Sequence, residues 1–154
     1  NVNEKTEAVK QVVEITVDSG AVRSMWPKGK RGVTRRKLDK KPKLMAANGT
    51  EIGVEGEAIL EFKKDERKCQ MKFIEGNVKK PLGAVSTIID EANEVFFSRR
   101  GSWIRNEATG EKIMIERSRG TFIIKLVTEE AKKGAKKEAM DMDGLDDEER
   151  KPSW

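Results

Sequence analysis

The stretch "VVEITVDSGAVRSMWP", residues 12–27, combines a strand pattern with a turn that carries an acid. Apolar and polar residues alternate before the acid, which is the period of a half-buried β-strand. The apolar members of this pattern are Val13, Ile15 and Val17. Asp18 ends the strand and is followed at once by Ser19 and Gly20, and all three residue types are common in turns. The fold and the function both depend on whether Asp18 is a turn residue or a reacting group.

The composition restricts which chemistry is available to the chain. Its 154 residues suit one domain with a core of its own. There is no histidine, which excludes Ser-His-Asp and Cys-His nucleophile systems and histidine-ligated zinc, and we expect neither a metal nor a cofactor. Cys69 is the single cysteine and cannot form an internal disulfide, so we expect an intracellular, reducing compartment. No apolar run is long enough to span a membrane.

The net charge of +5 is distributed unevenly along the chain. Residues 28–43 hold nine Lys and Arg against one Asp, carry prolines at their borders and show no periodicity, so we interpret them as a basic loop. Residues 128–154 hold nine acids against six bases and little apolar content, which predicts a charged tail that begins helical and needs a partner to hold it. Residues 1–10 are predicted to be a polar lead-in to the domain 11–127.

The segment between the basic loop and the tail is typical of short strands separated by glycine. Asn48-Gly49 predicts a hairpin with a type I′ turn, because that turn needs positive φ at both central residues. Strand patterns follow around residues 58–62, 69–76 and 95–97, and three more strands are predicted in 101–127. Helical spacing over 82–89 predicts one short helix. The expected fold is therefore all-β, a small barrel or folded sheet.

Three motifs in this order resemble the retroviral-type, or retropepsin-like, aspartic proteases, in particular the protease domains of retrotransposon polyproteins. They are "ITVDSGA" at 15–21, "AANGTEIGVEG" at 46–56 and "PLGAVSTI" at 81–88. The first corresponds to the family's active-site turn, the second to its glycine-rich flap hairpin, and the third to the apolar-apolar-Gly element before a short helix. The third match is partial, because Ala84, Val85 and Ser86 depart from the family's usual run.

The resemblance implies a small closed barrel with a flap hairpin, an aspartic endopeptidase activity and a set of site residues. The implied catalytic turn is Asp18, Ser19 and Gly20, in which the serine and the glycine fix the carboxylate by hydrogen bonds. The implied flap, which closes over a polypeptide substrate, consists of Ala47, Asn48, Gly49, Thr50, Ile52 and Gly53. The implied psi-loop consists of Leu82 and Gly83.

Amide hydrolysis by this route needs two carboxylates that share one proton, one to deprotonate a water molecule and one to protonate the carbonyl oxygen. One chain has a single Asp-Ser-Gly motif, so the second carboxylate must come from a second copy. The sequence therefore predicts that activity requires a homodimer in which two Asp18 side chains meet across the twofold axis.

Two other functions and one plain interpretation stay open at this stage. Asp18 can be a turn residue in a retropepsin-like fold that serves as a structural or accessory subunit of a larger assembly. The basic loop can bind the phosphates of RNA or DNA, through Arg31, Arg35, Arg36 and Lys37. The same loop can also be solvated and without a ligand, since runs of like charge often are.

Overall fold

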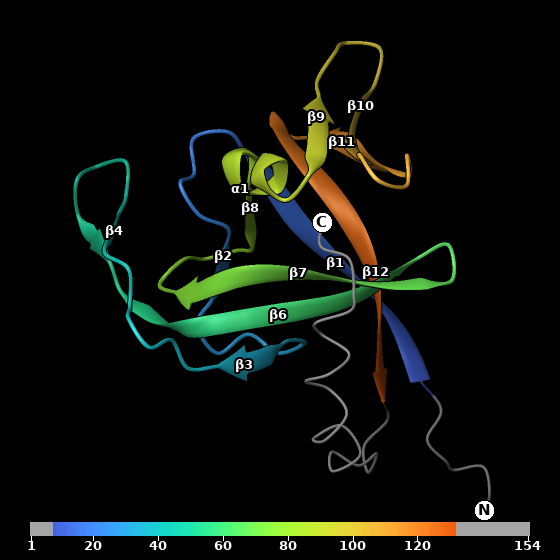
Figure 1. Ribbon diagram of the computed structural model, residues 1–154. Coiled ribbons are helices and arrows are strands. Elements are labelled where there is room, and N and C mark those ends of the chain that lie inside the picture. Colours follow the sequence, from blue (N-terminus) through green and yellow to red (C-terminus); the bar gives the residue numbers. More distant parts are fainter. Residues whose placement is uncertain (1–7, 132–154) are drawn as a thin grey trace, which may run out of the picture.

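The computed structural model describes residues 8–131 of the chain, and most of them lie in β-strands (Figure 1). The longest strands include β1 (Ala8–Asp18), which contains residues 12–18 of the stretch "VVEITVDSGAVRSMWP". Ile15 and Val17 of β1 are buried and Glu14 is exposed, so the predicted alternation is confirmed. Each buried Ile or Val side chain contributes about 1.5–3 kcal/mol, which is why this strand has one fixed register.

Eleven further strands and one short helix follow β1 in the described part of the chain. They are β2 (Met25–Pro27), β3 (Thr34–Arg36), β4 (Leu44–Met45), β5 (Glu51–Ile52), β6 (Val54–Lys64), β7 (Arg67–Gly76), β8 (Leu82–Ala84), α1 (Val85–Asp90), β9 (Asn93–Phe96), β10 (Ser102–Asn106), β11 (Lys112–Ser118) and β12 (Thr121–Ala131). The chain is therefore an all-β protein with one short helix, as the sequence predicts.

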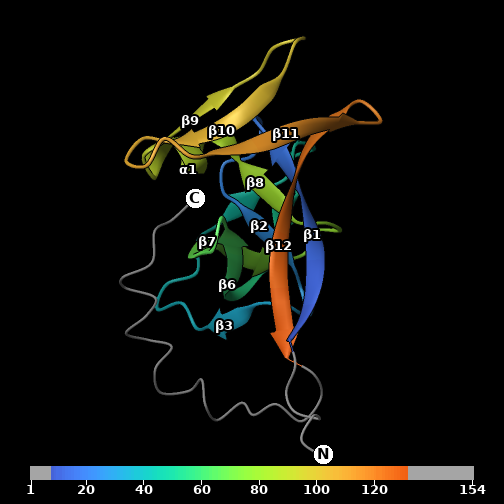
Figure 2. The ribbon, with the colours of Figure 1, turned by 90° about the vertical axis from the view of Figure 1, so that its right-hand side faces the viewer.

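Ten of the strands form one sheet, in the order β3-β6-β7-β2-β8-β1-β12-β11-β10-β9. Val127 of β12 also pairs with Lys63 of β6. Within the series β6, β7, β2, β8, β1 and β12, each strand therefore pairs with the next, and the last strand pairs with the first. Figures 1 and 2 show β1 and β12 side by side along the molecule, with β9, β10 and β11 at one end. Strands β4 and β5 form a separate hairpin.

Strand β8 lies between β1 and β2, two strands that follow each other in the sequence. Residues 16–18 of β1 pair in parallel with 82–84 of β8, and Met25 of β2 pairs with Leu82 from the other side. The N–H of Ala84 donates a hydrogen bond to Oγ of the buried Ser24, over 3.0 Å. The turn that follows Asp18 is therefore tied at its far end to β8.

The main core lies between the long strands. Ile15, Ile124 and Phe73 are buried there with Trp26, whose ring centroid is 5.2 Å from that of Phe73. Cys69 is completely buried in the same cluster, where it packs as a small apolar residue. Close packing of this kind holds β1 and β7, and with them the turn that starts at Asp18, in one arrangement.

The hairpin predicted at Asn48-Gly49 is present, but the predicted type I′ turn is wrong. Only Gly49 of this pair has a positive φ, 88°. Its N–H donates to the carbonyl of Ala46 over 2.9 Å, and the N–H of Ala46 donates to the carbonyl of Thr50 over 2.7 Å. The loop is thus a three-residue connection with glycine in the left-handed region, the next most common way to close a hairpin.

The boundaries of the basic loop and the helix differ from the prediction. Residues 28–43 are not entirely loop, because β3 inside them pairs with β6 as an exposed edge strand. The helix begins at Val85, and Leu82 belongs to a strand, because the pairing of β8 with β1 and β2 overrides the helical spacing.

The two ends of the β domain also differ from the predicted boundaries at residues 11 and 127. Strand β1 begins at Ala8, inside the predicted lead-in, and β12 continues to Ala131, inside the predicted tail. These two residues pair with each other, so the long hairpin-like ribbon of β1 and β12 includes both segments. The predicted tail beyond Ala131 and the first seven residues lie outside the described residues.

The turn between β6 and β7 has positive φ at both central residues, Asp65 (52°) and Glu66 (71°). A left-handed conformation costs a non-glycine residue roughly 1–2 kcal/mol. We expect Glu66→Gly to raise the free energy of unfolding in urea by about 0.5–1 kcal/mol. In Lys68→Gly, on the extended strand β7, the free energy of unfolding should fall by a similar amount. An equal decrease in the free energy of unfolding in both variants would contradict the left-handed conformation of Glu66.

Candidate active site

Asp18 lies at the last position of β1, where it pairs with Ala84 of β8. The N–H of Gly20 donates a hydrogen bond to Oδ1 of Asp18 over 2.8 Å. The N–H of Ala21 lies 3.4 Å from the carbonyl oxygen of Asp18, which closes a tight turn. Asp18 is half-buried as a residue, and the turn orients its carboxylate through one exposed hydrogen bond.

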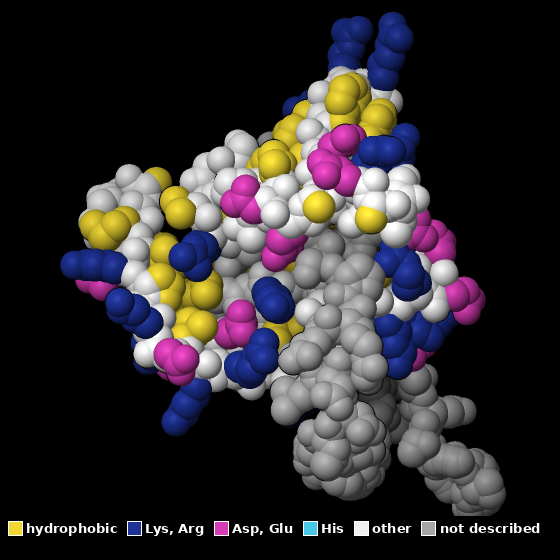
Figure 3. Space-filling view, viewed as in Figure 1, with side chains coloured by type: hydrophobic (Ala, Val, Ile, Leu, Met, Phe, Trp, Pro, Cys, Tyr) yellow, Lys and Arg dark blue, Asp and Glu magenta, His cyan; other side chains and the backbone are white. Residues whose placement is uncertain are grey.

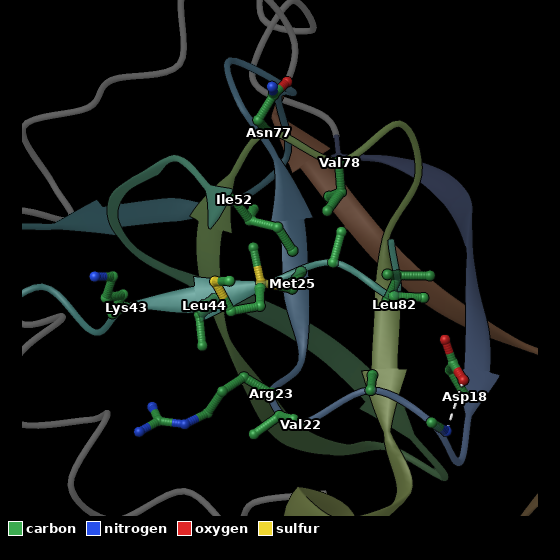
Figure 4. Close-up of a pocket in the computed structure, with 15 residues that line it drawn as sticks. Asp18, Val22, Arg23, Met25, Lys43, Leu44, Ile52, Asn77, Val78 and Leu82 are labelled. Carbon is green, nitrogen blue, oxygen red and sulfur yellow. Dashed lines mark hydrogen bonds between the residues drawn. The ribbon is translucent and has the colours of Figure 1, made fainter. Parts of the chain in front are cut away.

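A cavity of about 510 Å³ adjoins this turn (Figure 4). Its lining comes from the turn after β1, from β2, from the β4–β5 hairpin, from the connection between β7 and β8, and from β8. The lining residues with large apolar side chains are Val22, Met25, Leu44, Met45, Ile52, Val78 and Leu82. The space therefore suits an apolar side chain of a ligand, with the carboxylate of Asp18 at its border.

Of the predicted flap residues, the structure brings Ala47 and Ile52 to this cavity. Asn48, Gly49, Thr50 and Gly53 are exposed and do not line it. Oδ1 of Asn48 accepts hydrogen bonds from the N–H of Thr50 over 3.0 Å and from its hydroxyl over 2.7 Å, so these two side chains shape the loop. The hairpin thus covers one side of the cavity through β4, β5 and Ala47.

The two predicted psi-loop residues have different positions. Leu82 lines the cavity, whereas Gly83 is buried in the core behind it. A Cβ atom on Gly83 would lie 3.2 Å from a methyl carbon of Ile15 and 3.2 Å from that of Met71. Gly83 therefore suits the close approach of β8 to its neighbours, and it does not line the cavity.

Two cations that the sequence analysis missed, Arg23 and Lys43, also line the cavity. Both are exposed, and neither takes part in an ion pair with another described residue. Figure 4 shows them on the side away from Asp18, with Met25 and Leu44 between. In Figure 3, Lys and Arg side chains stand next to hydrophobic ones on the side that carries β4. Of the described residues that line the cavity, only Asp18 is acidic.

The four cations predicted to bind nucleic acid are not brought together as a set. Nε of Arg35 donates to both carboxylate oxygens of Glu75, over 3.0 and 2.9 Å, and Nε of Arg36 lies 3.3 Å from Oε1 of Glu57. Arg31 lines a different cavity, on the outer side of β1, and Lys37 lines none of the cavities described here. Half of the predicted set therefore stabilises the fold of the basic loop.

Glu75 is the acid on which the first part of the basic loop depends. Its side chain is only 8% exposed and also accepts a hydrogen bond from the N–H of Gly29 over 2.7 Å. The hydrogen bond from Arg35 holds the pKa of Glu75 below its ordinary value, against the opposing effect of burial. Arg35 also donates to the carbonyl of Lys30 over 2.6 Å, so one acid and one arginine fasten the segment from Gly29 to β3.

The chain was compared with protein-family models, with curated proteins and with solved structures, and none of the three comparisons gave a match. No helix within residues 8–131 is long and apolar enough to cross a membrane. The same residues contain no group of three or more metal-ligating side chains.

We expect Glu75→Gln to lower the free energy of unfolding at neutral pH by roughly 1–3 kcal/mol, because it weakens a charge-assisted pair on a buried group. The pKa of Glu75 is depressed, so its contribution is present above the ordinary value of 4.5 and is lost as the pH falls through the depressed pKa. The difference in urea unfolding between the two proteins should therefore shrink as the pH is lowered below 4.5. Glu57→Gln, which changes a more exposed ion pair, should lower the free energy of unfolding by less than about 1 kcal/mol. If the free energy lost in Glu75→Gln does not change with pH, the stabilising role of the ionised Glu75 is excluded.

Proposed function

We propose that the chain is an aspartic endopeptidase of retroelement type that is active as a homodimer. The observation that carries the proposal is the carboxylate of Asp18 at the border of an apolar cavity that the β4–β5 hairpin covers. Two further features support it: the hydrogen bond from Gly20 that orients this carboxylate, and the insertion of β8 between β1 and β2 beneath the turn. The three sequence motifs that carry the resemblance thus contribute to one cavity.

The chemistry follows from two such carboxylates, one from each copy. One is ionised and takes a proton from a water molecule as its oxygen adds to the peptide carbonyl carbon. The other is protonated and gives its proton to the carbonyl oxygen, so a neutral tetrahedral diol forms. Its breakdown returns a proton to the leaving amine and frees the two peptide ends. The described residues of one chain bring one carboxylate to this cavity, so a monomer should be inactive.

Asp18→Asn should reduce cleavage of an unbiased peptide library by more than about a thousandfold, because an amide cannot accept the proton of the water. The variant should keep the circular dichroism spectrum and the native mass of the wild-type protein. The wild type should be a dimer by native mass measurement and be inhibited by a transition-state analogue of aspartic proteases. Undiminished cleavage by the variant would overturn the assignment. A monomeric, inactive wild type would favour an accessory role instead.

The cations at the cavity predict which peptides are cleaved best. A peptide that fills the cavity with an apolar side chain and has a Glu nearby can pair with Arg23 or Lys43. We expect Glu-containing peptides to exceed their Gln counterparts about two- to fivefold in kcat/KM at low salt, since an exposed pair contributes up to about 1 kcal/mol.

The combined variant Arg23→Glu and Lys43→Glu should reverse this order and favour Lys-containing peptides. Arg99→Glu, in the turn between β9 and β10, serves as a control outside the cavity and should leave the order unchanged. A preference that does not change in the combined variant would show that these two cations do not contact the substrate.

A further inference from the structure

A second cavity, of about 360 Å³, lies along β1 on the side away from β12. Lys30 and Arg31, from the connection after β2, and Lys79 and Lys80, from the connection before β8, line it together. We call these four residues and the cavity the basic groove. Glu14 is the only acid among the described residues that line it. Two segments far apart in the sequence thus build one strongly positive surface.

The four cations of the groove are available to a ligand. None of them takes part in an ion pair with a described residue, in contrast to Arg35 and Arg36 of the same loop. All four are exposed. The side-chain ammonium of Lys30 lies 5.9 Å from the ring centroid of Trp26. Unpaired cations that converge in a cavity favour a ligand with several negative charges.

The groove also offers an open strand edge. β8 pairs with β1 only from Thr16 onward, and no other strand within residues 8–131 pairs with the Val12–Glu14 part of that edge. Val12 is 60% exposed, although it is a large apolar residue in the lining. An open edge accepts an added strand through backbone hydrogen bonds, and an exposed Val accepts an apolar side chain. Phosphate groups of a nucleic acid can use neither feature, so an extended acidic peptide fits the groove better.

The chain itself carries a segment with this chemistry. Residues 140–149 read "MDMDGLDDEE" and hold six acids and no base. Met140 to Asp143 alternate apolar and acidic residues, which is the period of an extended strand with one charged face. Six negative charges match the four positive ones of the groove, and the two methionines match the exposed Val12.

The connection from β12 is long enough for residues 140–149 to reach the basic groove. Strand β12 ends at Ala131, which pairs with Ala8 at the start of β1. Val12 is four residues further along β1, roughly 13 Å at the rise of a strand. Asp141 follows Ala131 by ten residues, which can span up to roughly 33 Å. The connection is long enough to pass around the end of β1 to its open edge.

We propose that the acidic segment Met140–Glu149 of this chain binds in the basic groove as an added strand along the open edge of β1. The bound segment would cover the part of β1 that leads to Thr16, where the pairing with β8 begins. The proposal does not depend on the proposed protease activity.

Hydrogen–deuterium exchange of the full chain tests this proposal. Amides of residues 140–149 should exchange at least about tenfold more slowly than in a synthetic peptide of residues 138–149, because backbone pairing protects them. The variant Lys79→Glu with Lys80→Glu should lose that protection, and so should a variant with all six acids of the segment replaced by Asn or Gln. Combining both sets of changes should cause no further loss, since each removes the same interaction.

The control is the variant Arg99→Glu with Arg100→Glu, which reverses two exposed adjacent cations in the turn between β9 and β10. This turn lies at the opposite end of the molecule from the start of β1 (Figures 1 and 2), and its variant should keep the protection. Free-peptide exchange rates in the wild type would overturn the proposal. So would binding of an oligouridylate to the groove with equal affinity in the wild type and in the acid-neutralised variant, because an occupied groove must bind it more weakly.

Discussion

The parallel pairing of Thr16–Asp18 with Leu82–Ala84 is the constraint on which the rest of the structure depends. It joins segments far apart in the chain, so the entropy of closing the loop between them must be recovered by burial. Gly83 makes this possible, because its missing side chain lets β8 approach Ile15 and Met71. The same pairing puts Asp18 beside the cavity and Leu82 in its lining. Asp18 and Leu82 lie far apart in the sequence, and this strand pairing brings them to the same site.

The described charges divide into those that are paired within the fold and those that border a cavity without a paired acid. Arg35 and Arg36 belong to the first kind, since each is paired with a glutamate from the sheet. Arg23 and Lys43 belong to the second kind, since they border an apolar cavity without a paired acid among the described residues. A count of nine cations in residues 28–43 cannot separate the two kinds, because partners such as Glu75 lie far along the sequence. Unpaired charges contribute more to the field around a cavity than charges that an opposite partner offsets.

The period-2 patterns predicted most of the sheet, because burial of one face acts on every second residue of strands such as β1 and β6. The sequence did not predict β3, because all of its residues are polar and exposed and show no alternation. This strand is defined by its pairing with β6. Asp65 and Glu66 escaped because their left-handed turn is imposed by the two long strands that it connects, without a glycine to mark it. The candidate site was predicted where motifs mark it, at Asp18, Ile52 and Leu82, and missed where only spatial proximity brings residues to it, as with Val78 and Lys43.

Among residues 8–131, Asp18 is the one acid that lines the cavity, and this restricts the shape of the proposed active form. A second carboxylate from another copy would come with a second cavity and a second pair of cations, related to the first by the twofold axis. A bound peptide has a direction, whereas the axis does not, so the two halves of the peptide would meet the same surfaces in opposite chain directions. In each half, the peptide residues next to the carboxylates would contact the apolar cavity, and residues farther from the carboxylates would contact the cations Arg23 and Lys43. In such a dimer, the substrates that satisfy both halves would be peptides with apolar residues around the cleaved bond and acidic residues on either side of them.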